Sequence, residues 1–361
     1  MNYNIENIAE YIVTYSLKIK PYEKVFVNFL GYNNDFLDIL YNCIKRHNAV
    51  PIVFSMTPNE EFDLIKNLNE ENVTELTDKN LKLLSKCNYY ISLLEDSDDI
   101  NYEKYQSQYN LYRKKYKKII RDYRLNHCKW IGLRLPSEKL ANQFNMNYKE
   151  FEKFYYNVCG LDYNQLKEDY MWLRDLLSKT NHIEIIRDDT NLCFDKNNIA
   201  AQILCGEKNL PDGEIYTSPI KDSVNGTIIF NTVSKQNNYS FENIKLKFEN
   251  GRIIDFDTNN NDLFNKIISI DDGSRYIGEF AIGINPMIEK PHGVILYDEK
   301  MKGSIHFALG QAYQDAYNGN DSSLHWDIVQ VQKPNYGGGI ILFDDEIIMK
   351  DGIIKNRKWR S

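Results

Sequence analysis

The sequence predicts an α/β protein of two domains, and three observations support this fold class. The chain has 361 residues, which is too long for one small domain and enough for two that each bury a core. Its first half alternates helix-like and strand-like patterns, whereas its second half is rich in strand-like runs. The pattern changes near 179–181, so we expect an N-terminal α/β domain at 1–180 and a C-terminal, strand-rich α/β domain at 181–361.

The first half contains a β-α-β pattern. Apolar residues recur at helical spacing over 5–12 and again over 36–44, and strand-type apolar runs lie at 24–29 and 50–54. A helix that connects two such strands predicts a parallel sheet. Further expected elements are strands at 89–94 and 130–135, and helices over roughly 102–120 and 147–180.

The second half is expected to be mostly strands. Asn250 and Gly251 separate two strand-like runs, and this dipeptide is a strong signal for a hairpin turn. The expected strands are 182–187, 226–232, 244–248 and 252–256, with helices near 261–269 and 306–317.

The composition argues against nucleic-acid and membrane partners. A net charge of −7 and a pI of about 5.5 provide no overall field that attracts a phosphate backbone. The tyrosines over 105–116 alternate with basic residues, and we interpret them as a helix that packs its rings and solvates its charges. No apolar run approaches the roughly 18 residues of a membrane span, and the N-terminus lacks a signal-peptide pattern. We expect a cytoplasmic protein whose six cysteines, which form no C-x-x-C pair, are reduced.

His325 and Asp327 form an H-x-D pair in a strand-like context. Residues i and i+2 of a strand point to the same side, so an imidazole and a carboxylate reach one point. Such a donor pair suits zinc, cobalt, manganese or iron, although an isolated H-x-D pair is a weak indication. Trp326 would then face the core.

His306 begins an apolar stretch that we expect to be helical. Tyr313 would lie two turns further along the same helix face, where its hydroxyl could stabilise an oxyanion near a metal. The alternative is an ordinary core histidine and core tyrosine on an amphipathic helix.

Two glutamates lie in the neighbouring motifs. Glu214 follows a Pro-Asp-Gly turn, where a carboxylate is more often solvated than catalytic. Glu279 precedes the strand-like run FAIGI, and a carboxylate there costs roughly several kcal/mol unless it is paired or bound to a metal. Three carboxylates and two histidines are about what two metals roughly 3.5–4 Å apart require. Spacing alone leaves open whether these segments meet.

The same segments resemble the M29 family of metalloaminopeptidases. The matching motifs are C-G-x-x-N-L-P-D-G-E-x-Y-T-S-P from residue 205, G-E-F-A-I-G-x-N-P from 278, H-x-A-L-G-x-A-Y from 306, and H-W-D from 325. The resemblance implies a homodimer and a C-terminal catalytic domain with two divalent metal ions, zinc or cobalt, with manganese or magnesium as alternatives. It implies as metal ligands Glu214, Glu279, His306, His325 and Asp327, with Tyr313 close by. It also implies release of N-terminal amino acids from peptides that have a free N-terminus.

A mechanism follows as a hypothesis from this resemblance. A metal-activated water would attack the first peptide bond, and Tyr313 would support the oxyanion. Glu279 is the expected bridging ligand, and either Glu214 or Glu279 would transfer the proton.

Two alternatives stay open. A ring-cleaving dioxygenase of the same fold would need a single iron, which His306, His325 and Asp327 could hold without either glutamate. A non-catalytic binding protein that kept the fold would be expected to have lost at least one ligand, and none is missing.

Overall fold

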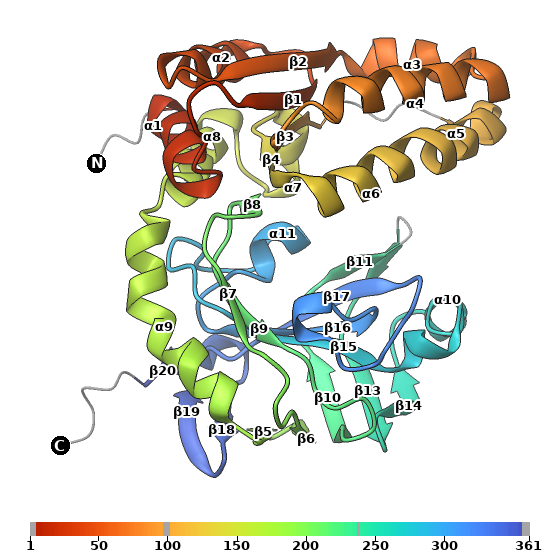
Figure 1. Cartoon of the computed structure of the whole chain (residues 1–361). Coiled ribbons are helices and arrows are strands. Elements are labelled where there is room, and N and C mark those ends of the chain that lie inside the picture. Colours follow the sequence, from red (N-terminus) through yellow and green to blue (C-terminus); the bar gives the residue numbers. More distant parts are fainter. Residues whose placement is uncertain (1–4, 97–101, 237–238, 356–361) are drawn as a thin grey trace. The chain divides into compact units, whose positions relative to one another are not determined.

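The computed structural model describes residues 5–96, 102–236 and 239–355. The chain forms two compact units. The first runs to Leu161 and includes Gly206–Pro211, and the second comprises Asp162–Cys205 and the chain from Asp212 onward (Figure 1). The second unit thus begins before residue 181 and includes helix α9 (Tyr163–Lys179). The boundary after residue 180 stays a prediction about independently folding domains.

The first unit contains a five-stranded sheet in the order β2-β1-β3-β4-β8. Every neighbouring pair in it is parallel, as the β-α-β pattern predicts. Its strands are β1 (Lys24–Leu30), β2 (Val50–Met56), β3 (Tyr89–Glu95), β4 (Lys129–Leu135) and β8 (Asn209–Leu210). The expected strands at 24–29, 50–54, 89–94 and 130–135 are confirmed, each with at most two more residues.

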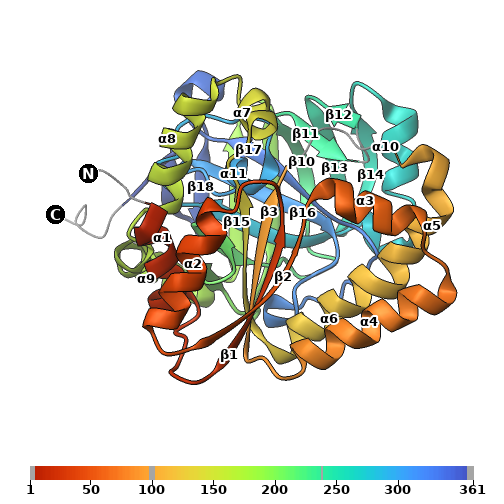
Figure 2. The same cartoon turned by 90° about the horizontal axis from the view of Figure 1, so that it is seen from above.

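Helices cover both faces of this sheet, which is why its strands read as nearly continuous apolar runs. On one side lie α1 (Ile5–Tyr11), α2 (Asp35–Arg46) and α8 (Tyr148–Cys159) (Figure 2). On the other lie α3 (Pro58–Lys66), α4 (Glu70–Leu84), α5 (Gln106–Tyr112) and α6 (Lys118–His127). Between α5 and α6 the chain forms a π-helical segment, η3 (Arg113–Lys117). The short α7 (Glu138–Gln143) precedes α8.

The helix expected over 147–180 is in fact two helices. Gly160 ends α8, and the Asp162 side chain accepts a hydrogen bond from the Gln165 N–H, which starts α9. A glycine at a helix end followed by an N-cap aspartate interrupts a helix even where the apolar periodicity continues.

The second unit is built from antiparallel sheets. An eight-stranded sheet has the order β14-β13-β10-β6-β5-β18-β19-β20, and a five-stranded sheet has the order β17-β16-β15-β9-β7. The strands of the larger sheet are β5 (His182–Arg187), β6 (Thr190–Asp195), β10 (Asn225–Phe230), β13 (Ile244–Glu249), β14 (Arg252–Asp257), β18 (Ile340–Phe343), β19 (Glu346–Lys350) and β20 (Ile353–Ile354). The smaller sheet contains β7 (Gln202–Leu204), β9 (Glu214–Thr217), β15 (Ile277–Gly283), β16 (Ser304–Gly310) and β17 (His325–Val331). A ribbon of β11 (Ser234–Gln236) and β12 (Tyr239–Phe241) and the helices α10 (Asn261–Ile267) and α11 (Ile295–Asp298) complete the unit.

Two local predictions for this unit are confirmed. Asn250 and Gly251 have φ of 49° and 77° in the turn between β13 and β14, and these values fit the expected hairpin turn. Helix α10 occupies most of the range expected to be helical, 261–269.

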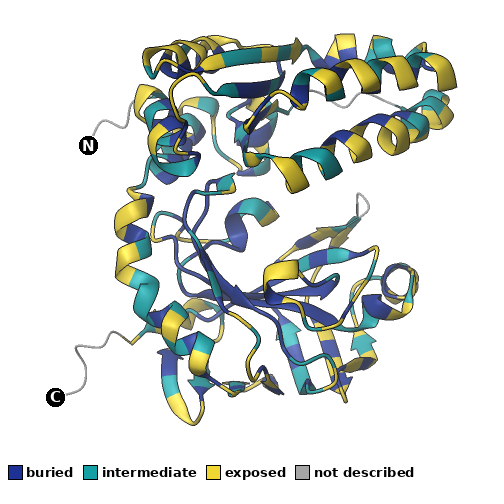
Figure 3. Cartoon of the chain, in the orientation of Figure 1, coloured by how far each residue is buried: buried dark blue, intermediate teal, exposed yellow. Residues whose placement is uncertain are grey.

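The two larger sheets of the second unit share an aromatic core. Phe280 of β15 and Phe307 of β16 have ring centroids 5.1 Å apart. Phe194 of β6 lies 5.2 Å and 5.9 Å from these two rings, and Phe230 of β10 lies 6.2 Å from Phe307. β15 and β16 are buried along their whole length (Figure 3). One face of the smaller sheet therefore supplies the core and its other face is available for polar groups.

The prediction of a helix over 306–317 is wrong. His306 lies in the middle of β16, between β15 and β17. Ile305, Phe307 and Leu309 alternate with His306 and Ala308, so the apolar run fits a central strand with period two as well as a helix. Gly310 ends the strand with φ of 99°.

Among the described residues, we find no helix that combines the length and the apolar character needed to cross a bilayer.

Candidate metal centre

The register of the smaller sheet gathers the predicted ligands on one face. In an antiparallel ladder, directly paired residues point to the same side of the sheet. Glu279 pairs with Ala308, and Ala308 pairs with Asp327. His306 therefore lies on this face too, because it is two residues from Ala308.

The two remaining ligands follow by the same rule. His325 lies two residues from Asp327 on β17, and Glu214 of β9 pairs with Gly283, four residues along β15 from Glu279. Trp326 points the opposite way, as expected, and its ring packs 5.2 Å from Phe241 and 5.4 Å from Phe264.

The ligand atoms lie close enough to share cations. His306 Nε2 is 3.4 Å from Glu214 Oε2 and 3.5 Å from Glu279 Oε1. His325 Nε2 is 3.7 Å from Glu279 Oε2 and 3.5 Å from Asp327 Oδ1. Glu214, Glu279 and His306 form one group with ligand atoms within 4.8 Å of one another, and Glu279, His325 and Asp327 form a second.

Several atoms of this cluster are buried without a hydrogen-bond partner in the described part of the chain. They are Glu214 Oε2, Glu279 Oε2, His306 Nδ1, His325 Nε2 and Asp327 Oδ1. Buried polar atoms are normally hydrogen-bonded, and an unpaired one costs about 1–3 kcal/mol. Oxygen and imidazole nitrogen donors that lack partners and converge on one place are what a divalent cation requires, so these residues fit a metal.

His325 is held in an orientation that suits coordination. Its Nδ1 lies 2.8 Å from the Gln311 carbonyl oxygen, so Nδ1 carries the proton and donates it to this acceptor. Nε2, which would be the metal-binding nitrogen, then faces Glu279 and Asp327. Hydrogen bonds of this type fix the tautomer of metal-binding histidines.

The electrostatics of the cluster favour bound positive charge. Burial acts to lower the pKa of His325, but the negative charges of Asp327 and Glu279 outweigh burial and raise the pKa to about 10. Burial likewise acts against His306, whose hydrogen bond to Glu279 and nearby Glu214 raise its pKa to about 9. Burial raises the pKa of Glu279. Without a metal, the negative charge of the carboxylates therefore keeps His306 and His325 protonated. A divalent cation could replace those protons.

Tyr313 reaches the cluster from a loop rather than from a helix. Its ring centroid lies 4.8 Å from that of His325 and 5.7 Å from that of Tyr216. The residue is 48% exposed. Burial around the hydroxyl and the charges of Glu279 and Asp327 raise the pKa of Tyr313, so the phenol keeps its proton.

Glu299 and Lys300 belong to the same cluster, and sequence reasoning missed both. Lys300 Nζ is 2.5 Å from Glu214 Oε1 and 2.9 Å from Glu299 Oε1, with all three side chains buried. Ligand atoms of Glu299, His306 and Asp327 lie within 4.8 Å of one another. Asp298-Glu299-Lys300 reads as an ordinary solvated charge run, and no sequence signal marked it. Among the described residues that could hold a metal, His292 is in none of these groups.

Comparisons with known proteins identify the family of this chain. The model of the thermophilic metalloprotease (M29) family matches residues 1–352. Aminopeptidase AmpS of Bacillus subtilis (strain 168) is 29% identical over 125 residues, covering 34% of this chain and 30% of that protein. Aminopeptidase 2 of Geobacillus stearothermophilus is 28% identical over 138 residues, covering 34% and 33%. The matched segment thus spans about a third of each of these relatives.

A solved structure shares the fold. Wild-type AmpT from Thermus thermophilus superposes with a TM-score of 0.76 over 98% of this chain and 99% of that chain, at 16% sequence identity. This likeness confirms a mixed α/β fold with a parallel N-terminal sheet and antiparallel C-terminal sheets. Because the family model covers nearly the whole sequence, the chain belongs to the M29 family of thermophilic metalloproteases.

Proposed function

We propose that this protein is a metal-dependent aminopeptidase with a dinuclear centre. The observation that carries the proposal is the position of Glu279, whose two carboxylate oxygens face different histidines. Glu279 is also the member shared by two groups of potential ligands. A carboxylate that bridges two cations about 3.5–4 Å apart is a recurrent feature of two-metal hydrolases.

The oxygen and nitrogen donors suit a metal ion of intermediate hardness in each position. Glu214, Glu279 and His306 would hold one ion, and Glu279, His325 and Asp327 the other. Carboxylate oxygen with imidazole nitrogen suits zinc or cobalt, with manganese or magnesium as alternatives. When bound, the ions would supply Lewis acidity and a water whose pKa is close to neutral.

The surrounding residues would bind and orient a peptide. Glu214 or Glu279 would accept the proton of the attacking water, and the protonated Tyr313 hydroxyl would donate a hydrogen bond to the developing oxyanion. Lys300 would hold Glu214 in place through their ion pair. A carboxylate of the cluster that is not committed to a metal, such as Glu299, would accept hydrogen bonds from the free α-ammonium group of a substrate. This preference for a charged N-terminus would explain exopeptidase action.

The remaining parts of the proposal rest on the family. The relatives named aminopeptidases support peptides with a free N-terminus as substrates. We further propose a cytoplasmic homodimer.

The arrangement favours this proposal over the two alternatives. A mononuclear iron dioxygenase would use His306, His325 and Asp327 and would leave the buried Glu279 without a metal, with Glu214 paired only to Lys300. A protein that had abandoned catalysis would have no reason to keep the whole donor set converging on one face.

The proposal is tested by hydrolysis of a leucine p-nitroanilide and by metal analysis of the purified chain. We expect activity to be lost on chelation and restored by zinc or cobalt, with two metal equivalents per chain at saturation. A single tightly bound iron, or no hydrolysis of several aminoacyl anilides with any divalent metal, would contradict the proposal.

A further inference from the structure

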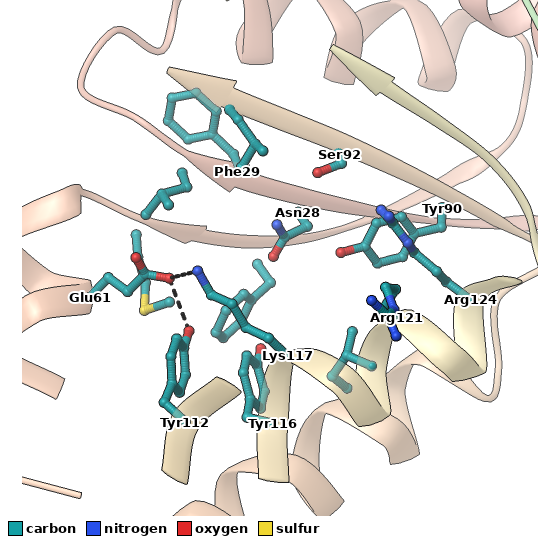
Figure 4. Close-up of a pocket in the computed structure, with 15 residues that line it drawn as sticks. Asn28, Phe29, Glu61, Tyr90, Ser92, Tyr112, Tyr116, Lys117, Arg121 and Arg124 are labelled. Atoms are coloured by element: carbon teal, nitrogen blue, oxygen red, sulfur yellow. Dashed lines mark hydrogen bonds and ion pairs between the residues drawn. The ribbon is translucent and has the colours of Figure 1, made fainter. Parts of the chain in front are cut away.

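A cavity of about 250 Å³ lies in the first unit, against the face of the parallel sheet that α6 covers (Figure 4). We call it the switch-point cavity. Asn28 and Leu30 line it from the carboxyl-terminal half of β1, and Ser92 and Leu94 line it from that of β3. The strand order reverses between β1 and β3. Open α/β sheets bind ligands at the carboxyl ends of their strands at such a reversal.

The floor of the switch-point cavity carries unused hydrogen-bonding groups. Ser92 is only 7% exposed, and its hydroxyl makes no hydrogen bond to any described residue. The amide of Asn28, two residues before the end of β1, also lacks a partner among the described residues. Both side chains line the cavity, so their polar atoms are free to hydrogen-bond to a molecule bound there.

The wall formed by α6 carries a half-buried cation. The Arg124 guanidinium lies 5.2 Å from the Tyr90 ring centroid and 4.9 Å from that of Trp130. Its Nε is buried without a hydrogen-bond partner, and in the described part of the chain no carboxylate lies within ion-pair distance of it. Burial lowers the pKa of Arg124, but a guanidinium stays charged because its ordinary pKa is above 12.

The other cations at the switch-point cavity already have anionic partners. Lys117 Nζ is 3.0 Å from Glu61 Oε1, which also accepts a hydrogen bond from the Tyr112 hydroxyl at 3.1 Å. Arg121 pairs with Asp122 at 3.2 Å on the surface. Figure 4 shows Arg121 and Arg124 projecting from the helix opposite Asn28 and Ser92. Arg124 is therefore the cation with free capacity for an anion.

The helix that forms this wall has an irregular backbone beside the cavity. The π-helical segment η3 lies between α5 and α6, and Tyr112 and Tyr116 stack with centroids 5.0 Å apart on either side of its start. Both rings line the cavity. π-helical turns are rare and frequently occur at functional sites. The segment thus places aromatic surface next to the charged and polar groups.

We propose that the switch-point cavity binds a small organic anion, in which a carboxylate or phosphate head group is attached to an aromatic or aliphatic body. The head group would accept hydrogen bonds from Arg124, Asn28 and Ser92, because a guanidinium and neutral donors are the groups that recognise such anions. The body would pack against Tyr112 and Tyr116. All residues that line the cavity belong to the first unit, and none is a candidate metal ligand.

Calorimetric titration of the full-length protein tests this site. The probes are phenyl phosphate and phenylacetate, with benzyl alcohol as a neutral compound of similar shape. We expect one anion per chain to bind at least tenfold more tightly than benzyl alcohol, with an affinity that falls as salt is added. Binding should be the same in zinc-loaded and metal-stripped protein, which separates this site from the metal centre. Preference for phenyl phosphate or for phenylacetate would identify the head group.

Paired variants locate the binding. Arg124→Gln should weaken binding of the anion at least tenfold, whereas Arg113→Gln, which removes an exposed charge of the adjoining segment η3 outside the cavity, should change affinity less than twofold. If Arg124→Gln does not fold, the double variant Asn28→Ala with Ser92→Ala should weaken binding at least fivefold. Equal binding of anions and benzyl alcohol, equal effects of the two arginine variants, or binding that requires zinc would overturn the proposal.

Discussion

The Lys300 ammonium group lies 2.5 Å from Glu214 Oε1, with both side chains buried within the cluster that we propose binds metal. Nearby Glu214 and Glu299 outweigh burial and raise the pKa of Lys300, so it stays charged. A protein cation thus already neutralises part of the negative charge that a metal would also neutralise. We therefore expect Lys300 to contribute most to the free energy of unfolding when no metal is present.

Substitution Lys300→Gln tests this relationship. Removing one member of a buried ion pair costs about 3–5 kcal/mol, because it leaves an uncompensated charge. We expect a loss of that size in the free energy of unfolding of the chelated protein, and a clearly smaller loss with saturating zinc. Urea denaturation with and without zinc measures both values. Lys290→Gln, at an exposed position, should have no effect in either condition, and identical losses for Lys300→Gln with and without zinc would contradict this role.

Substitution Glu279→Ala should abolish both activity and the two-metal stoichiometry. Both groups of ligands contain Glu279, so its removal leaves each with only two donors. We expect fewer than one metal equivalent per chain by elemental analysis and a loss of at least a thousandfold in kcat/KM. Glu249→Ala, at an exposed position on β13, serves as the control. Full activity with Glu279→Ala would exclude a bridging role.

Substitution Tyr313→Phe should separate catalysis from metal binding. Loss of one donor to an oxyanion typically lowers kcat by about 10²–10³. Because the phenol stays protonated beside carboxylates, we expect kcat to fall while metal content stays unchanged. Tyr317→Phe removes an exposed hydroxyl that donates to Asp321 at 2.7 Å, and its kcat should equal that of the wild type. A changed KM with unchanged kcat would assign Tyr313 to substrate binding instead.

Asp271 should make stability depend on pH. Its carboxylate accepts hydrogen bonds from the Ser323 N–H at 2.7 Å, from the Ser322 hydroxyl at 2.7 Å and from the Ser274 N–H at 3.0 Å. Burial alone would raise the pKa of Asp271, but these hydrogen bonds outweigh it and lower the pKa. A carboxyl group whose pKa is lower in the folded than in the unfolded protein stabilises the fold at a pH above its unfolded-state pKa of about 3.9. That stabilisation is lost as the pH falls through the folded-state pKa.

Substitution Asp271→Asn tests that linkage. In chelated protein we expect the variant to be about 1–2 kcal/mol less stable than the wild type at pH 7, since hydrogen bonds to charged groups contribute on this scale. The difference should shrink below about pH 4. Urea denaturation at pH 7 and pH 3 compares the two, and a difference that is constant with pH would show that charge has no part in it.

Local patterns predicted much of the first unit from the sequence. The strands at 24–30 and 50–56 are apolar runs bounded by turns and separated by an amphipathic helix, and such units have few alternative folds. The common direction of His325 and Asp327 was also predictable from the sequence, because any strand points residues i and i+2 to the same side. Motif resemblance then indicated the remaining candidate ligands.

Long-range pairing decided what these patterns left open. Residues 304–310 form a strand because β15 and β17 flank them, although the same apolar run could cover one side of a helix. Glu214 is buried because β9 pairs with β15, whereas its Pro-Asp-Gly context suggested a solvated turn.

The sequence by itself determined the strands of the first unit and the types of residue that are candidate metal ligands, because both depend on neighbours within a few positions. Tertiary structure alone decided that Lys300 and Glu299 enter the cluster and that Asn28, Ser92 and Arg124 line one cavity. These residues carry no local signal. Their chemistry arises only when sheet register and helix packing remove them from water and place them beside partners far away in the chain.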